Sequence, residues 1–113
     1  MIHTIDAKDK TVGRVATEAA KFLIGKNTTT FKRNAAPSVS VKIINAAAAK
    51  IHPKKEGKLF HSYSGYFGGL KKETLISLAT RRGYSEVFKR AVKGMLPKNK
   101  LQAKMLKNLS VTE

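Results

Sequence analysis

The sequence predicts an α/β fold, in which helices cover a mostly parallel, four-stranded sheet. Short β-branched stretches that alternate apolar and polar residues are separated by longer stretches with the apolar period of an amphipathic helix. Strands that alternate with helices favour parallel pairing, because each helix carries the chain back to the same end of the sheet. The chain has 113 residues, of which 42% are hydrophobic, so it fits one domain spanning residues 1–113.

The first half of the chain contains two predicted strands and one predicted helix. Residues 2–5 alternate apolar and polar, and residues 39–45, V-S-V-K-I-I-N, are rich in β-branched side chains. Thr11 is a candidate N-cap for a helix that Gly25 ends. The polar and basic residues 26–38 between that helix and the second strand predict a surface loop.

The second half of the chain predicts more helix than strand. Arg81 and Arg82 offset the macrodipole at the end of one helix, which Gly83 stops. Asn99 and Gln102 have the spacing of a capping box at the start of the last helix. In order, the predicted elements are a short helical turn at 46–49, an exposed basic turn at 52–58, a strand at 59–63, a helix at 71–82, a helix capped by Ser85, a helix after Asn99 and a final strand at 108–112.

The helix capped by Ser85 has two sides of opposite character. At about 100° per residue, its apolar residues share one side and its basic residues cluster on the other. We therefore expect the first side to build the core and the second to form a basic ridge on the surface. The apolar side consists of Val87, Phe88, Ala91, Val92 and Met95, and the basic ridge of Lys89, Arg90 and Lys93.

Positive charge dominates the composition. The chain has 23 lysine and arginine residues against 7 aspartate and glutamate residues, a formal net charge of +16. Solubility of a small domain needs a net charge of only ~2 to 8, so a polyanion is the expected partner. An acidic membrane surface is the alternative, but the chain has no tryptophan, no stretch near the ~18 apolar residues of a membrane span and no signal pattern in residues 1–25. We expect a cytoplasmic protein that binds no membrane.

The stretch from His61 to Lys72, H-S-Y-S-G-Y-F-G-G-L-K-K, combines aromatic rings, glycines and two lysines. RNA suits this combination, because it presents phosphates to lysines, 2′-hydroxyls to exposed amides and unstacked bases to rings. The alternative is an ordinary strand-to-helix turn whose rings pack against the core. The candidate RNA contacts in this stretch are Tyr63, Ser64, Gly65, Tyr66, Gly68, Gly69, Lys71 and Lys72.

Basic side chains elsewhere are further candidates for phosphate contacts, among them Lys89, Arg90 and Lys93 of the basic ridge. Arg14 lies near the positive N-terminal end of the first helix, where an anion is stabilised. Lys32 and Arg33 lie beside an aromatic residue in the predicted surface loop. Arg81 and Arg82 are also placed to meet phosphate, although the helix macrodipole is a sufficient structural reason for both. For each of these residues, a solvated surface position is the alternative.

The sequence lacks the residues that catalysis or metal binding would need. It has no cysteine, and its three histidines lie far apart, so neither thiol chemistry nor a zinc site is predicted. The seven acids are spread along the chain and offer no cluster for Mg²⁺. A pairing of His61 with Ser62 or Ser64 has no nearby acid to orient the base. We therefore predict no enzyme, no cofactor, no metal and no small-molecule substrate.

Two stretches read together resemble one family. Residues 63–72, Y-S-G-Y-F-G-G-L-K-K, and residues 91–98, A-V-K-G-M-L-P-K, are similar to the universal large-subunit ribosomal protein numbered thirteen in the bacterial scheme. Residues 5–17, I-D-A-K-D-K-T-V-G-R-V-A-T, match the family's opening strand, turn and first helix, and I-I-N-A at 43–46 matches its second strand. V-K-G-M-L-P is the most specific part of this resemblance.

The resemblance implies a three-layer α/β/α domain without catalytic activity, bound to the ribosomal RNA (rRNA) of the large subunit beside neighbouring ribosomal proteins, with an early role in subunit assembly. By position, it implies RNA contacts from Arg14, residues 63–72, Lys93, Gly94 and Lys98. This sequence lacks the basic, tryptophan-containing arm and the longer tail of bacterial members. It also departs from the family pattern at residues 34–37, Asn99 and Gln102.

We therefore predict a structural protein of the cytoplasmic ribosome that binds large-subunit rRNA through phosphate neutralisation and shape rather than through sequence readout. A DNA-binding architectural protein is the alternative within nucleic-acid binding. A small RNA-processing enzyme is the alternative from another functional class.

Overall fold

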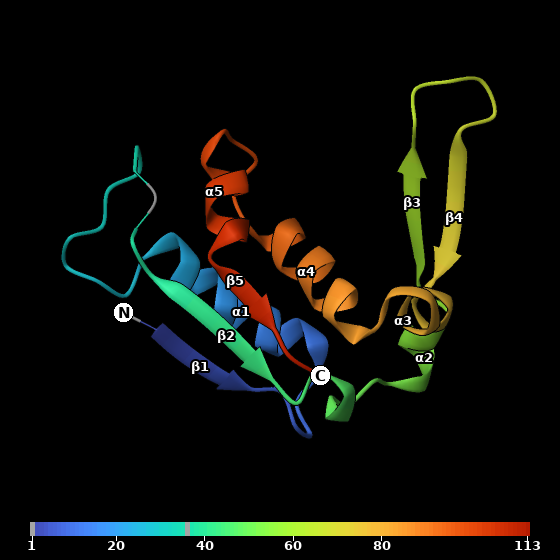
Figure 1. Ribbon diagram of the computed structural model, residues 1–113, viewed down its shortest axis with the longest axis horizontal. Coiled ribbons are helices and arrows are strands. Elements are labelled where there is room, and N and C mark those ends of the chain that lie inside the picture. The colour runs from blue at the N-terminus through green and yellow to red at the C-terminus, as the bar shows by residue number, and fades with distance from the viewer. Residues whose placement is uncertain (1, 36) are drawn as a thin grey trace.

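The computed structural model describes residues 2–35 and 37–113, with the backbone alone at residues 55 and 56. Ala36, inside the loop predicted over residues 26–38, lies outside the described residues. Figure 1 shows the elements, which are β1 (Ile2–Asp6), α1 (Val12–Ile24), β2 (Ser40–Ile44), the 3₁₀ helix η1 (Ala46–Ala48), α2 (Pro53–Glu56), β3 (Leu59–Tyr63), β4 (Leu70–Thr74), α3 (Leu75–Arg82), α4 (Tyr84–Met95), α5 (Leu101–Lys107) and β5 (Leu109–Val111).

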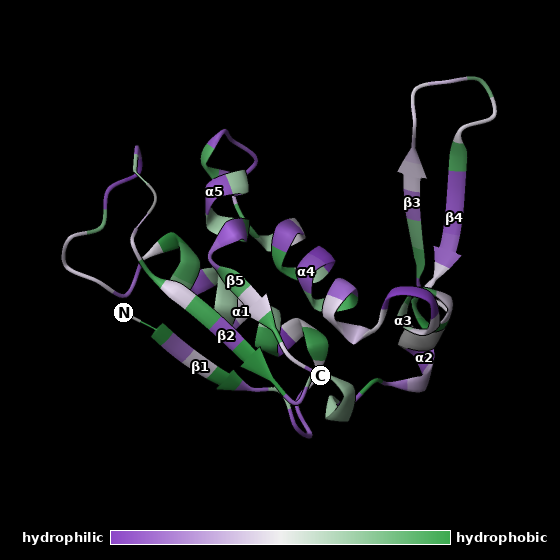
Figure 2. Cartoon of the chain, in the orientation of Figure 1, coloured by the Kyte–Doolittle hydropathy of each residue, from purple (hydrophilic) through white to green (hydrophobic). Residues whose placement is uncertain are grey.

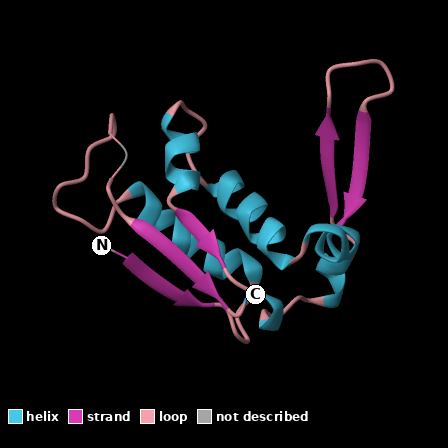
Figure 3. Cartoon of the chain, viewed as in Figure 1, coloured by secondary structure: helices cyan, strands magenta, loops and turns pink. Residues whose placement is uncertain are grey.

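A parallel sheet with helices confirms the predicted α/β class. Its strands follow the order β1-β2-β5, with Ile5 opposite Ile43 and Val41 opposite Leu109. This sheet has three strands rather than the predicted four, because β3 pairs elsewhere. The strand predicted at 59–63 forms an antiparallel hairpin with β4, separate from the parallel sheet (Figure 3).

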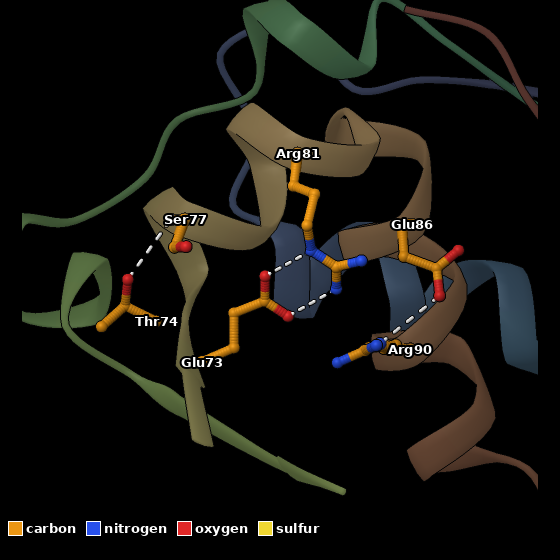
Figure 4. A network of polar contacts seen from close by, with 6 residues as sticks. All are labelled: Glu73, Thr74, Ser77, Arg81, Glu86 and Arg90. Atoms are coloured by element: carbon orange, nitrogen blue, oxygen red, sulfur yellow. Dashed lines mark hydrogen bonds and ion pairs between the residues drawn. The ribbon is translucent and has the colours of Figure 1, made fainter. Parts of the chain in front are cut away.

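The hairpin corrects the helix predicted over residues 71–82. Residues 70–74 are extended, since the glycine-containing loop returns the chain directly beside β3 and a short loop of this kind joins antiparallel strands. Thr74 is the N-cap of α3, and its side-chain oxygen accepts a hydrogen bond from the Ser77 amide at 3.2 Å (Figure 4). The helix therefore begins at Leu75, one residue after a favourable cap.

Side chains along the parallel sheet alternate between a buried face and an exposed face. Ile5, Val41 and Ile43 are buried, whereas Thr4 and Lys42 point to the exposed face. Figure 2 shows this alternation of hydrophobic and hydrophilic residues along β1 and β2. Helices α1, α4 and α5 share one core with the buried side chains of these strands, whereas α2 and α3 lie at the base of the hairpin, so the arrangement differs from the predicted three layers. A sheet covered on both faces needs nearly continuous apolar strands, and these strands carry polar residues at every second position.

The main core lies between the sheet and helices α1 and α4. Small residues on α1 let α4 approach closely, and Phe88 and Val92 of α4 are completely buried there. At the edge of this core, the His3 and Phe22 rings stack with centroids 4.2 Å apart. The buried residues of α1 are Val15, Ala16, Ala19, Ala20 and Leu23.

A second, smaller cluster of buried residues fixes the hairpin to the rest of the chain. Leu75 and Leu78 of α3 pack with Val87 of α4, and the half-buried Ile51 and Phe60 pack against them. Phe60 belongs to β3, so this cluster determines how the base of the hairpin sits relative to α4. The tip of the hairpin projects away from the sheet and the helices (Figure 1).

Helix ends agree with the sequence only in part. Gly25 ends α1 in the left-handed conformation at φ 83°, as predicted. Thr11 occupies the N-cap position of α1, but its side chain makes no capping hydrogen bond. The helix predicted after Ser85 begins at Tyr84, and Gly83 takes the N-cap position. The turn predicted at 52–58 contains the short helix α2. No helix in the described part of the chain is long and apolar enough to cross a membrane.

The capping box predicted from Asn99 and Gln102 does not form, because Lys100 takes the N-cap position of α5 and its side chain makes no capping hydrogen bond. The Asn99 side-chain oxygen accepts a hydrogen bond from the Leu101 amide at 3.0 Å. The Gln102 side chain does not reach back to Asn99, because its Nε2 donates to the Lys93 carbonyl oxygen at 2.9 Å. Gln102 therefore ties α5 to the end of α4 instead of capping its own helix.

Candidate nucleic-acid interface

Helix α4 presents basic side chains on the side that faces away from the core. Val87, Phe88 and Val92 are buried, whereas Lys89 and Lys93 are exposed, as the predicted basic ridge requires. Met95 departs from the predicted apolar side, because it is 42% exposed at the last turn of the helix. Its sulfur lies 3.3 Å from the Thr17 hydroxyl of α1, which donates a hydrogen bond to it.

A groove of about 910 Å³ separates this basic ridge from the hairpin. Strand β3 forms one wall, and α4, the segment after it and α5 form the other. Four basic residues line the groove against one acid, Glu86, which is already paired with Arg90 at 3.4 Å (Figure 4). The groove residues are Phe60, His61, Ser62, Glu86, Lys89, Arg90, Lys93, Gly94, Lys98, Asn99, Gln102 and Leu106.

Phe60, in the wall of this groove, is contacted by two cations. The Lys58 ammonium and the Arg90 guanidinium each lie 5.6 Å from the centroid of the Phe60 ring. Contacts of this length are favourable cation–π interactions. Arg90 lines the groove beside this ring, and its Nε donates to Glu86 while its two Nη groups remain as further donors.

The loop at the hairpin tip is exposed, so its aromatic rings do not pack on the core. Tyr66 is 79% exposed and Phe67 is fully exposed. This geometry contradicts the alternative of a packing turn. Gly65 and Gly68 have φ angles of 86° and 71°, which favour glycine.

Gly69 requires glycine for a different reason. Its φ is not positive, but an added Cβ would collide with the Ser64 hydroxyl and lie 2.9 Å from the Tyr66 carbonyl oxygen. The Gly69 amide donates to this same oxygen at 2.9 Å. Below the loop, Lys72 pairs across the hairpin with His61, and Lys71 pairs with Ser62.

The structure brings Lys32 and Arg33 to a second hollow beside the groove. This hollow has a volume of about 340 Å³ and is also lined by Pro97 and Asn99. Asn99 lines both the hollow and the groove, so the two candidate regions adjoin at the segment that follows α4. Lys26 is a third basic residue of this hollow.

Three predicted contacts lie outside these surfaces. Arg14 is exposed on the first turn of α1 and lines neither the groove nor the hollow. Arg82 is likewise exposed at the end of α3, outside both linings. Arg81 is occupied within the chain, since its Nε and Nη2 donate to the two Glu73 carboxylate oxygens at 2.8 and 2.7 Å (Figure 4). These hydrogen bonds lower the pKa of Glu73 from its ordinary value of 4.5.

Sequence reasoning missed several residues of the groove. Phe60 belongs to a segment interpreted only as a strand, and His61 begins the predicted RNA-binding stretch but is not among its candidate contacts. Lys58, which contacts the Phe60 ring without lining the groove, belongs to a segment interpreted only as an exposed turn. Gln102 was interpreted as a cap. The available signal was the alternation of basic and aromatic residues from Lys58 to His61, K-L-F-H, next to the predicted ligand loop. Pairing of β3 with β4 brings this segment opposite α4, and no local pattern shows that.

The arrangement fits the backbone of a nucleic acid better than a small molecule. It offers several cations along one groove, an aromatic wall and an exposed glycine-containing loop with tyrosines. Among the described residues, no group of three or more histidine, aspartate and glutamate side chains lies close enough to hold a metal ion.

Comparison with known proteins identifies the family. The family model described as Ribosomal protein L13 matches residues 1–113. The large ribosomal subunit protein uL13 of Nitratiruptor sp. is 45% identical over 113 residues, covering 96% of this chain and 78% of that protein. The uL13 proteins of Sulfurimonas denitrificans and Salinispora arenicola are 42% and 43% identical, with 95% and 96% of this chain and 77% and 74% of theirs covered.

These matches extend over nearly the whole chain and beyond the two stretches that carried the resemblance. The family is one of ribosomal structural proteins and not of enzymes, so an RNA-processing enzyme is set aside. The chain belongs to the ribosomal protein L13 family, whose matched members are proteins of the large ribosomal subunit.

Proposed function

We propose that this chain binds large-subunit rRNA as a single structural domain, residues 1–113, and that it joins the cytoplasmic ribosome at an early stage of subunit assembly. One observation carries the proposal. Four basic side chains line a groove whose one acid is already paired, and an exposed aromatic loop projects beside that groove. Phosphates would be neutralised by Lys89, Lys93 and Lys98, with Arg90 held by Phe60.

The hairpin loop would add contacts that phosphate neutralisation alone does not provide. Tyr63 and Tyr66 present exposed rings for unstacked bases, and their hydroxyls suit the 2′-hydroxyl of RNA. Gly65, Gly68 and Gly69 keep the loop backbone accessible to the RNA backbone. Neighbouring ribosomal proteins are the further partners that family membership supports.

Binding to a large-subunit rRNA transcript, competed with duplex DNA of equal phosphate concentration, tests the proposal. We expect the duplex DNA to compete weakly, because loop stacking and 2′-hydroxyl contacts favour unpaired RNA. Equal competition by the duplex would instead support the DNA-binding architectural protein. Rate-zonal sedimentation of a cell lysate gives the matching measurement in the cell. Co-migration of the protein with large subunits is expected, and a free or chromosome-bound pool would contradict the proposal.

A further inference from the structure

A second cavity lies behind the wall of the groove. It has a volume of about 510 Å³ and adjoins the groove at the residues that line both spaces, Phe60, Arg90 and Gly94. A volume of this size falls within the range of roughly 300 to 1,000 Å³ that is typical of ligand pockets. The start of α1, the linker after η1, β3, α3 and α4 all contribute to its lining.

The floor of this cavity is apolar and its rim is basic. Ile51, Leu75 and Val87 supply apolar surface, and Lys50, Lys58 and Arg90 supply positive charge. No acid is among the residues that line the cavity. Lys50 is held at the rim because its amide donates to the Lys10 carbonyl oxygen at 2.9 Å, beside the start of α1. An apolar floor beneath a positive rim fits a flat ring that carries an anionic group.

The position of the cavity next to the groove indicates which ligand would bind in it. RNA lying in the groove runs along Phe60 and Arg90, which form the shared wall. A nucleotide turned out of the strand at this wall would place its base on the apolar floor and its phosphate among the rim cations. We propose that this cavity takes one unstacked nucleotide of the bound RNA, an inference that rests on the RNA-binding function proposed above.

Titration of the ¹⁵N-labelled full chain with adenosine monophosphate (AMP), followed by NMR, tests the cavity directly. Ribose 5-phosphate is the matched control, because it carries the same phosphate and sugar but no base. We expect AMP to shift the amides of Gly13, Ile51 and Ala91, which line the cavity, and ribose 5-phosphate to leave them nearly unchanged. Equal shifts with both ligands, or no shift of these amides with AMP, would overturn the proposal.

Gly13→Leu tests whether RNA uses the cavity. An added Cβ at Gly13 meets no atom within 4 Å, so a side chain can start there without a clash. Thr17, one turn further along the same side of α1, contacts the sulfur of Met95, which also lines the cavity. A leucine at position 13 is therefore directed toward the cavity and fills part of it.

We expect Gly13→Leu to weaken binding of the large-subunit rRNA transcript by roughly fivefold or more, the loss of one stacked base. Ala103→Leu, on the exposed side of α5 and outside both cavities, should leave the affinity unchanged. Unchanged affinity in a folded Gly13→Leu protein would overturn the inference, and if that variant fails to fold, the AMP titration decides. Failure of the proposed function looks different, because the unmodified chain would then not bind the transcript at all.

Discussion

Lys93 combines a structural contact with a proposed RNA contact in one residue. The Lys93 carbonyl oxygen accepts a hydrogen bond from the Gln102 side chain, and this bond connects α5 to α4. The Lys93 side chain is exposed in the groove. A substitution at this position changes the side chain and keeps the carbonyl oxygen. The effects on folding and on RNA binding can therefore be separated.

Lys93→Glu should weaken binding to the rRNA transcript by about tenfold or more, because one charged hydrogen bond is lost and a repulsive charge is added. Its melting temperature should stay close to that of the original chain, since the lysine has no ion-pair partner among the described residues. Lys107→Glu is the matched control, because it makes the same charge change on α5 outside the groove. A Lys93→Glu protein that melts early but binds normally when folded would place the RNA on another face.

Leu96, three residues further along, should respond in the opposite way. It is only 3% exposed and packs in the main core, so Leu96→Ala should lower the free energy of unfolding by roughly 2 to 5 kcal/mol. Thermal and denaturant melts measure this loss, and the folded fraction should still bind RNA. Met95→Ala provides the comparison next to it. At 42% exposure it should cost about 1 kcal/mol or less, and equal losses at both positions would contradict the burial pattern.

At the scale of elements, substitutions in the hairpin loop should affect RNA binding and stability to different extents. Gly68→Val places a β-branched residue at positive φ, and Gly69→Val introduces a clash with Ser64 and the Tyr66 carbonyl oxygen. The loop lies far from the core, so the strain can relax locally. We expect RNA affinity to fall several-fold and the melting temperature to change little. Parallel losses of affinity and melting temperature in both variants would show that the loop supports the fold.

The Glu73–Arg81 pair fixes β4 to α3 and makes their docking sensitive to acid. The pKa of Glu73 is lowered in the folded chain by its hydrogen bonds from Arg81, below the ordinary value of 4.5. The stabilisation is therefore complete above pH 4.5 and is lost as the pH falls through the lowered value. Glu73→Gln should remove this part of the pH dependence. Melting curves of both proteins between roughly pH 6 and pH 3 test it, and curves that stay parallel would contradict the pair's contribution.

The elements that the sequence predicts well are those with strong local signals. The apolar periodicity of α1 and α4, Gly25 as the end of α1 and the β-branched strand β2 all appear in the structure. Strand β4 could not be predicted from its own residues, L-K-K-E-T, because lysine and glutamate favour helix. Its strand conformation comes from pairing with β3, a contact that depends on the loop between them. Helix periodicity likewise misplaced Met95, which lies at the end of its helix.

At the scale of the whole molecule, the site is assembled from distant segments. Sequence reasoning found the basic residues of α4, the hairpin loop and Lys32 with Arg33 as separate candidates. In the fold, the basic residues of α4 and strand β3 line one groove. Lys32 and Arg33 line the hollow beside this groove, and Asn99 lines both. The sequence does not indicate Phe60 as a groove residue, because a phenylalanine in a strand is ordinarily a core residue. Its role in the wall depends on Lys58 and Arg90, which reach it from different elements.

The net charge of +16 belongs to the whole chain, but only charges that contact phosphate should release counterions. The logarithm of the RNA affinity should therefore fall linearly with the logarithm of salt concentration, with a slope of about −0.7 to −0.9 per phosphate contacted. A triple variant, Lys89→Gln with Lys93→Gln and Lys98→Gln, removes three lysines of the groove. It should make the slope shallower by about 2 to 3.

A second triple variant separates the groove from the total charge. Lys100→Gln with Lys104→Gln and Lys107→Gln removes the same number of charges, but none of these lysines lines the groove. This variant should keep nearly the full slope and lose affinity only through weaker long-range attraction. Fluorescence anisotropy of a labelled rRNA transcript over a series of salt concentrations measures both slopes. Equal changes in the two variants would mean that RNA responds to the overall charge and has no preferred position in the groove.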